Sequence, residues 1–178
     1  MKEFFYRLAG FDLIQFAPSY ENFQEGGSIE ASCEYDFGFN KDNSILRNTI
    51  TLSFLQERTP ILNIQFATFI EIKEESVNSF IKDSKFVISK DEQAQFASFG
   101  YGALRGIMYL KTVNTPLEGL ILPPVFMNDI FKEPLELSIE DEKGISEAGA
   151  GKLSFLGYFC KILKSNDLQQ GRSIFVYY

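Results

Sequence analysis

The stretch that decides the fold is SKDEQAQFASFGYGALRGIMYLKTVNTPLEGLILPPVFMNDIF, residues 89–131. It predicts a capped helix, a loop broken by proline, an apolar turn and a short second helix. Ser89 and Glu92 form a capping box, in which the serine hydroxyl accepts the amide proton of residue 92 and the carboxylate accepts that of residue 89. We expect the long helix over about residues 90–113, ending before Pro116, because proline disfavours helix in the residue before it.

Small and apolar residues follow this helix in two adjacent stripes. One stripe holds Ala97, Tyr101, Leu104 and Met108, and the other holds Phe96, Gly100, Ala103 and Ile107. Two stripes at helical spacing indicate that more than one face of the helix requires burial. One face is expected to pack on the chain's own sheet and the other on a neighbouring subunit.

Glycines and one arginine mark the expected subunit contact. Each glycine lowers the intrinsic helix stability by about 1 kcal/mol relative to alanine. This cost is explained if two helices cross closely here, because small residues let their backbones approach each other. Arg105 lies on the same apolar helix, and a buried unpaired charge is strongly destabilising. We therefore expect Arg105 to form a salt bridge, within the chain or across the interface. The predicted oligomer interface consists of Gly100, Gly102, Arg105 and Gly106.

Four segments before the helix have the patterns of β-strands. They are residues 3–16, 29–39, 45–56 and 61–72. The second alternates strictly between apolar and polar residues, which is typical of a strand with one buried and one solvent-exposed face. Short turns between the last three predict antiparallel pairing. Strands followed by helices predict an α+β fold, with a four-stranded antiparallel sheet and a long and a short helix packed on one face.

The strands and residues 89–131 together resemble the SecB family of bacterial export chaperones. That family carries a helix ending near an aromatic-x-x-Arg step, followed by a Leu-x-Pro-Val-x-Phe-x-x-Leu-Phe turn. The matching residues are Leu104, Arg105, Leu122, Pro124, Val125, Ile130 and Phe131. Met127 replaces the family's aromatic residue, although Phe126 lies beside it. The resemblance implies a SecB-like domain over residues 1–132, with a tail at 133–178.

The resemblance also implies a function: an ATP-independent, non-enzymatic holdase for unfolded or precursor polypeptides, assembled as a dimer of dimers. Its peptide groove is implied between the loop joining the first two strands, the sheet and the second helix. The corresponding residues are Pro18, Tyr20, Phe23, Tyr35, Phe54, Val125, Phe126, Ile130 and Phe131. The alternative is that these residues complete the core, as apolar residues at core-facing positions usually do. Tyr20 and Phe23 fit a groove best, because their loop is polar and flanked by glycine.

Three carboxylates share the wet face of the second strand, namely Glu30, Glu34 and Asp36. In the SecB family the export ATPase SecA docks on an acidic sheet face, so the resemblance implies a docking surface here. The alternative is a solvated face whose charges prevent sheets from sticking to one another. No loop with the usual calcium-ligand spacing accompanies these residues, and we expect no metal or cofactor.

The tail over residues 133–178 does not match the polar, flexible tail of the family. Its last apolar segment, LSFLGYFCKILK, leaves two interpretations open. It is an extra helix or strand docked on the domain, or a mobile amphipathic segment that contacts a partner or a membrane. The mismatch puts a partnership with SecA in doubt. Together with Met127, it supports an alternative function as an adaptor dedicated to one protein, such as an antitoxin or a phage protein.

Composition narrows the classes of function. The 178 residues are enough for one domain with a substantial core, and the net charge of -7 argues against nucleic-acid binding. The absence of histidine removes the commonest general base and metal ligand, so an enzyme is the weakest interpretation.

Cys33 and Cys160 do not form a disulfide framework. Without a signal-peptide pattern or a run long enough to span a membrane, we expect a cytoplasmic protein.

Overall fold

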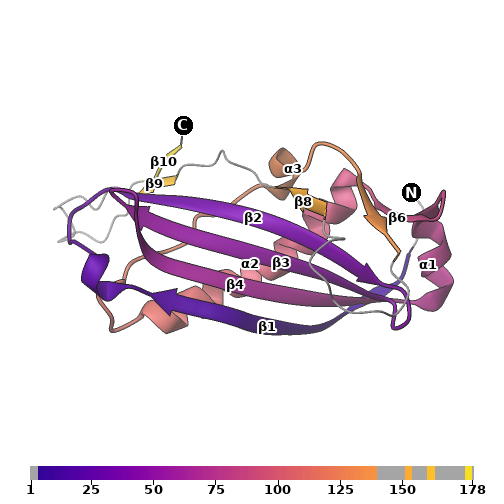
Figure 1. Ribbon diagram of the computed structural model, residues 1–178, viewed down its shortest axis with the longest axis horizontal. Coiled ribbons are helices and arrows are strands. Elements are labelled where there is room, and N and C mark those ends of the chain that lie inside the picture. The colour runs from indigo at the N-terminus through magenta and orange to yellow at the C-terminus, as the bar shows by residue number, and fades with distance from the viewer. Residues whose placement is uncertain (1–3, 140–150, 154–159, 163–174, 178) are drawn as a thin grey trace.

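The computed structural model describes residues 4–139, 151–153, 160–162 and 175–177 (Figure 1). The main sheet contains β1 (Tyr6–Pro18), β2 (Ile29–Asn40), β3 (Ile45–Gln56) and β4 (Thr59–Ile72). These strands lie in the order β1-β4-β3-β2, and all neighbours are antiparallel. The predicted four-stranded antiparallel sheet is therefore confirmed. Because β1 and β2 lie at opposite edges of this set, residues 19–28 cross from one side to the other and are called the crossover loop here. This loop contains a short 3-10 helix, η1 (Tyr20–Asn22).

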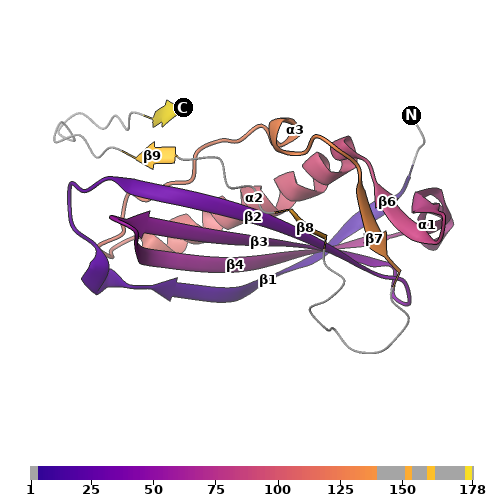
Figure 2. The ribbon, with the colours of Figure 1, turned by 45° about the horizontal axis from the view of Figure 1, so that its top comes forward.

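Two helices cover one face of the sheet, namely α2 (Lys90–Thr112) and α3 (Met127–Ile130), whereas α1 (Glu74–Phe80) lies at one end of the sheet (Figures 1 and 2). The capping box of α2 is present: the Ser89 hydroxyl accepts the Glu92 amide at 3.3 Å, and the Glu92 carboxylate accepts the Ser89 amide at 2.7 Å. The helix ends at Thr112, within the predicted limits. A long helix and a short second helix on one face of the sheet are thus confirmed.

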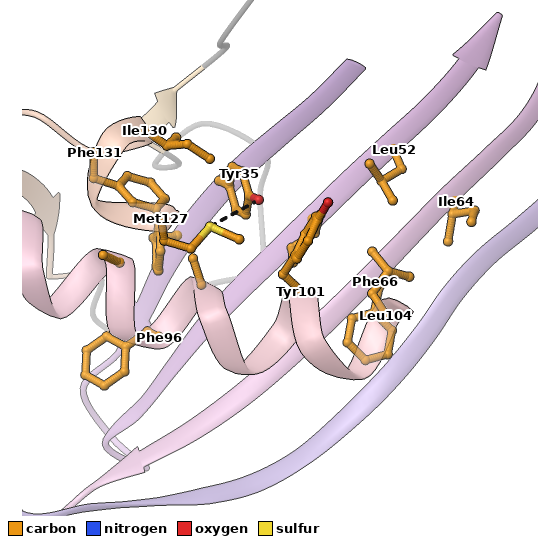
Figure 3. Packing of buried hydrophobic residues seen from close by; sticks show 14 of the residues in the cluster. Tyr35, Leu52, Ile64, Phe66, Phe96, Tyr101, Leu104, Met127, Ile130 and Phe131 are labelled. Atoms are coloured by element: carbon orange, nitrogen blue, oxygen red, sulfur yellow. Dashed lines mark hydrogen bonds between the residues drawn. The ribbon is translucent and has the colours of Figure 1, made fainter. Parts of the chain in front are cut away.

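The hydrophobic core lies between the sheet and α2. On β2 every second side chain, from Ile29 to Phe39, faces this core, and the intervening side chains face the opposite side. Phe66 from β4 and Phe96 from α2 are fully buried in the same cluster (Figure 3). Burying one large apolar side chain contributes about 1.5–3 kcal/mol. The period-two pattern of the strands and the helical stripe of α2 therefore meet in a single core.

A second, smaller antiparallel sheet closes one end of the core. It consists of β5 (Ile81–Lys82), β6 (Lys85–Ile88) and β7 (Leu135–Ser138), in that order. Asp83 and Ser84 join β5 to β6, and both have positive φ, as a two-residue hairpin turn requires. Leu135 and Leu137 of β7 are buried. The packed domain therefore continues past residue 132, into the segment that the sequence analysis placed in the tail.

Three further short strands come from the tail. They are β8 (Gly151–Leu153), β9 (Cys160–Ile162) and β10 (Phe175–Tyr177). β8 and β9 each pair antiparallel with β2, and β10 pairs with β9. The described part of the tail is therefore docked on the domain as strands. No helix among the described residues is both long enough and apolar enough to cross a membrane.

Candidate functional site

Four of the nine residues implied in peptide binding lie in the core instead. Tyr35, Phe54, Ile130 and Phe131 are all buried. The Tyr35 hydroxyl donates to the Met127 sulfur at 3.5 Å, and the Tyr35 and Phe131 rings meet edge to face at 5.4 Å (Figure 3). The implied groove residues on the sheet and α3 are thus corrected to core residues. The reason is that α3 packs directly against β2 and closes the space in which a peptide would lie.

The other five implied residues remain accessible to different degrees. Phe126 is 82% exposed and Tyr20 is 39% exposed. Pro18, Phe23 and Val125 are half-buried. The structure does not gather the five into one patch, because η1 and α3 lie well apart in both ribbon views (Figures 1 and 2). The crossover loop and the approach to α3 therefore form two separate accessible regions.

A cleft opens between the crossover loop and residues 113–126, which are called the helix-connecting loop here. It has a volume of about 500 Å³ and is lined by Phe23, Glu25, Thr115, Pro116 and Glu118. One aromatic ring and one proline ring thus face an open, acid-rimmed space. Such a cleft can take an apolar side chain and leave the adjoining backbone in solvent.

The crossover loop is fixed to the sheet by hydrogen bonds. The Gln56 side chain accepts from the Gln24 amide at 2.7 Å and donates to the Gln24 carbonyl at 2.9 Å. The Asn22 side chain donates to the Pro60 carbonyl at 2.9 Å. At position 27 a Cβ atom would lie 1.8 Å from the Gln56 amide nitrogen, so a larger residue there would displace the Gln56 side chain from these hydrogen bonds. These contacts hold Tyr20 and Phe23 in place before any ligand arrives.

The helix-connecting loop is fixed to α2 in the same way. The Tyr101 hydroxyl donates to the Pro123 carbonyl at 2.9 Å, and Arg105 Nε donates to the Leu122 carbonyl at 3.0 Å. Arg105 is exposed, and among the described residues it has no salt-bridge partner. The predicted intrachain salt bridge is therefore replaced by a bond to a carbonyl. Water solvates the charge, so no carboxylate is required to stabilise it.

The glycines of α2 fall into two groups. Gly100 is buried on the chain's own sheet, where a Cβ atom would lie 2.6 Å from Thr68 Oγ1 and 3.1 Å from Ile50 Cδ1. This close approach of helix and sheet accounts for Gly100 within a single chain. Gly102 and Gly106 are exposed, and a Cβ atom at either would meet nothing within 4 Å. These two glycines are the ones left open to a neighbouring helix.

An apolar surface accompanies the open glycines. On α2, Tyr109 and the 71%-exposed Leu110 lie at helical spacing from Gly102 and Gly106. On β1, Leu8 and Phe11 stand opposite Ile70 and Thr68 of β4, which places them on the helix-covered side of the sheet. Both are nevertheless exposed, because α2 does not extend over them. The same side of the sheet thus carries apolar side chains that nothing within the described chain covers.

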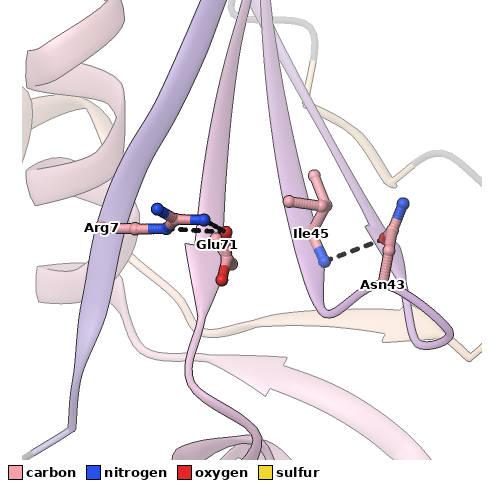
Figure 4. Close-up of polar contacts among 4 residues, drawn as sticks. All are labelled: Arg7, Asn43, Ile45 and Glu71. Atoms are coloured by element: carbon pink, nitrogen blue, oxygen red, sulfur yellow. Dashed lines mark hydrogen bonds and ion pairs between the residues drawn. The ribbon is translucent and has the colours of Figure 1, made fainter.

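The opposite face of the sheet carries the three predicted acidic residues. Glu30 is exposed, whereas Glu34 and Asp36 are half-buried. Asp36 lies 3.8 Å from the Arg47 guanidinium. Arg7 on β1 donates to the Glu71 carboxylate, with 2.8 Å between Nε and Oε2 (Figure 4). Basic side chains therefore interrupt the acidic surface.

Cys33 is the only cysteine whose side chain is described. The pKa of its thiol is raised from 9.0 to about 12, chiefly by desolvation and with a smaller contribution from the neighbouring Glu34, against a hydrogen bond with Tyr35 that lowers it. The thiol is protonated at neutral pH and is a poor nucleophile, because the thiolate is the reactive form. Among the described residues, no group of three or more aspartate, glutamate or cysteine side chains is placed to hold a metal ion.

No protein-family model matches this chain, and no curated protein sequence is significantly similar to it.

Sequence reasoning missed several accessible residues. Ile121 is exposed in the helix-connecting loop, and Phe5 and Ile14 are exposed at β1. Ile14 is the extra residue of a β-bulge, between the pairs that Leu13 and Gln15 make with β4. The sequence indicated that the first strand is irregular around Gly10, but it did not predict the bulge that exposes Ile14.

Proposed function

We propose that this protein is a SecB-like holdase, which binds unfolded polypeptides without ATP and without enzymatic activity. The observation that carries this proposal is Phe126, whose ring is 82% exposed although the loop leading to it is hydrogen-bonded to α2. Exposed apolar patches usually mark surfaces that bind protein or ligand, and Ile121 is exposed in the same loop as Phe126. Apolar contacts suit a holdase because they provide affinity without reading sequence.

The cleft beside Phe23 supports the same proposal. An apolar side chain of an extended client would enter between Phe23 and Pro116, while Tyr20 and Phe126 would contact other parts of the same client. Each contact contributes about 25 cal/mol per Å² of apolar area, less the cost of ordering the client. Separate weak contacts on one long client reinforce one another, because the first contact raises the local concentration of the rest.

The uncovered apolar surface supports assembly into a dimer of dimers. β1 forms one edge of the sheet and has no second strand partner among the described residues. In the proposed assembly, β1 edges pair within a dimer, and the α2 surface bearing Gly102, Gly106 and Leu110 joins two dimers. Arg105 beside these glycines would then contact the second dimer.

SecA remains a candidate partner in this proposal. Glu30, Glu34 and Asp36 lie on the face on which an export ATPase would dock. Arg47 lies close to Asp36 and reduces the negative charge presented there. Any such docking is therefore expected to centre on Glu30 and Glu34.

A second candidate function is an adaptor with the same fold that serves one protein partner. It is favoured by β8, β9 and β10, since a tail docked as strands differs from the polar, flexible tail of the export chaperones. An adaptor would bind its partner through the same accessible residues, but it would not protect unrelated proteins from aggregation.

Light scattering of a denatured, unrelated protein diluted into buffer tests the proposal, combined with the mass of this protein in solution. The holdase predicts suppression near one oligomer per client, at the mass of a tetramer. Phe126→Ser should weaken suppression, and Lys132→Ser, also on the surface and outside the accessible aromatic regions, is the matched control. A monomer that does not suppress aggregation would overturn the holdase, and capture of a single partner would then support the adaptor.

A further inference from the structure

β1 carries three large apolar side chains that are exposed and equally spaced along the strand. Leu8 is 44% exposed, Phe11 is 45% exposed and Ile14 is 49% exposed. Phe11 stacks on Phe66 of β4, with 5.6 Å between the ring centroids, so the core supports one side of its ring. Single exposed apolar residues are ordinary on a protein surface, whereas a contiguous row of them marks a contact surface.

β1 is also an open edge of the sheet. It pairs antiparallel with β4, and among the described residues no strand pairs with its other side (Figure 2). Two bulges interrupt it, at Ala9 and at Ile14, and the regular stretch between them is residues 10–13. A bulge bends its strand and increases the twist. An unrelated, regular strand would therefore follow this edge only between the bulges, whereas a second copy of β1 carries the same two bends.

The two faces of the sheet restrict how two copies of β1 can pair. Residues directly opposite each other in an antiparallel pair lie on the same face. Phe11 and Leu13 lie on the helix-covered face, and Gly10 and Asp12 lie on the other, as their pairs with β4 show. Two identical strands related by a two-fold axis keep these faces matched only when one residue stands opposite its own copy. The bulges come closest to meeting when that central residue is Phe11 or Asp12.

Charge and apolar matching select Phe11 as the centre. A centre at Asp12 sets two aspartates opposite each other, and like charges in such a pair are destabilising. It also leaves the exposed Ile14 opposite Gly10. A centre at Phe11 sets the two phenylalanines opposite each other and Asp12 opposite Gly10. Because Leu8 and Ile14 are equally far from Phe11 along the strand, each of them then stands opposite the other.

We propose that a second copy of this chain covers β1 by antiparallel pairing centred on Phe11, so that Phe11 meets Phe11 and Leu8 meets Ile14 of the other copy. The inference rests on the proposed function in taking β1 as the edge that pairs within a dimer, and it adds the register of that pairing. In this register all three exposed apolar side chains of the strand are covered by one another.

Disulfide trapping tests the register in the full-length chain. The background is Cys33→Ala with Cys160→Ser, and one new cysteine is introduced at a time. Opposed residues of an antiparallel pair have Cα atoms about 4.5–5.5 Å apart, which a disulfide can span. Under mild oxidation, Phe11→Cys should form a covalent dimer at least about tenfold faster than Asp12→Cys, which is the control one position away. Non-reducing electrophoresis and the intact mass measure both rates.

A second trap leaves Phe11 in place. Chains with Leu8→Cys and chains with Ile14→Cys, unfolded and refolded together, should form a covalent heterodimer. Neither variant should crosslink when it is refolded alone, because the two copies of one position then lie about 20 Å apart along the pair. The unmixed variants are thus the matched controls for random collision.

Three results would each overturn the inference: faster crosslinking of Asp12→Cys than of Phe11→Cys, equal crosslinking of the mixed and unmixed variants, or no crosslinking in any of them. Crosslinking through Asp12 would shift the register. The absence of crosslinks in a protein with the mass of a dimer or a tetramer would move the subunit contact away from β1. A mixed disulfide between Phe11→Cys and an unfolded client that carries cysteine, in place of the dimer, would assign the edge to the client.

Suppression of aggregation by the background protein, measured together with its mass, separates this inference from the proposed holdase. Suppression without the expected crosslinks would leave the holdase standing and remove the register. The expected crosslinks without suppression would retain the paired β1 edges and remove the holdase.

Discussion

Phe126 and Phe131 lie five positions apart around one helical turn, and the structure treats them in opposite ways. Phe126 precedes α3 and is 82% exposed, whereas Phe131 follows it and is 1% exposed. Phe131 contacts the rings of Tyr35 and Phe37, while Phe126 faces solvent. Residue type and neighbourhood in sequence therefore do not decide between the core and the exposed surface. The side of a short helix that meets the sheet does.

The largest expected effect separates these two phenylalanines directly. Phe131→Ala should lower the free energy of unfolding by about 3–5 kcal/mol, because it leaves a cavity between α3 and β2. Phe126→Ala should change it by less than about 0.5 kcal/mol, as exposed substitutions usually do. Urea unfolding monitored by circular dichroism measures both. Similar losses of unfolding free energy for the two variants would show that Phe126 also packs in the core.

The two groups of glycines extend the comparison to α2. Gly100→Ala should destabilise the fold by about 1–3 kcal/mol, because the new Cβ atom overlaps Thr68 Oγ1 and overpacks the helix–sheet contact. Gly102→Ala meets no atom and should raise helix stability by up to about 1 kcal/mol.

Gly102→Leu tests the subunit contact separately from stability. It should keep the unfolding midpoint measured at high dilution and reduce the mass in solution below that of a tetramer. A Gly102→Leu protein that stays fully tetrameric would contradict the proposed role of this surface.

Cys33 tests how tightly the edge of the core is closed. Its folded pKa, about 12, lies above the ordinary value of 9.0, so the folded state favours the protonated thiol. The resulting stabilisation is complete below pH 9 and is lost as the pH rises from 9 through 12. In a Cys160→Ser background, alkylation at pH 8 should be at least about tenfold slower in the native protein than in urea. Equal rates would show an ordinary, accessible thiol.

The smallest expected effect concerns Arg105. Arg105→Ala removes one partly exposed hydrogen bond to the Leu122 carbonyl and should lower the free energy of unfolding by about 0.5–1.5 kcal/mol. If Arg105 also contacts a second dimer, the mass in solution will fall with it. Arg105→Lys is the matched control, because it keeps the charge but not the guanidinium geometry. Unchanged mass for both variants would confine Arg105 to its role within the chain.

Local patterns predicted much of the fold. Three features depend only on residues close together in sequence: the capping box at Ser89, the end of the helix before Pro116 and the alternation in β2. Each could therefore be predicted without knowledge of any tertiary contact. The second sheet was not predicted, because β5 has two residues and β7 joins β6 from a distant part of the chain. Short strands have almost no periodicity of their own.

The candidate site divides in the same way. Tyr20 and Phe23 were predicted as accessible from the polar, glycine-flanked loop that carries them, and the structure leaves Tyr20 exposed and Phe23 at the cleft. Tyr35 and Phe54 were assigned to the same groove because they lie on the apolar face of the sheet. Alternation identifies that face, but it does not say whether a helix or a peptide covers it.

The sequence by itself determined the four strands of the main sheet and the two helices after them, which face of β2 is apolar, and where α2 begins and ends. Those properties follow from spacing along the chain and from hydrogen bonds between near neighbours. Tertiary structure alone decided that α3 closes over Tyr35, that Gly100 lies against Thr68, and that β8 and β9 share the edge of β2. These contacts join residues far apart in sequence, and they depend on how much of each apolar face its partners can cover.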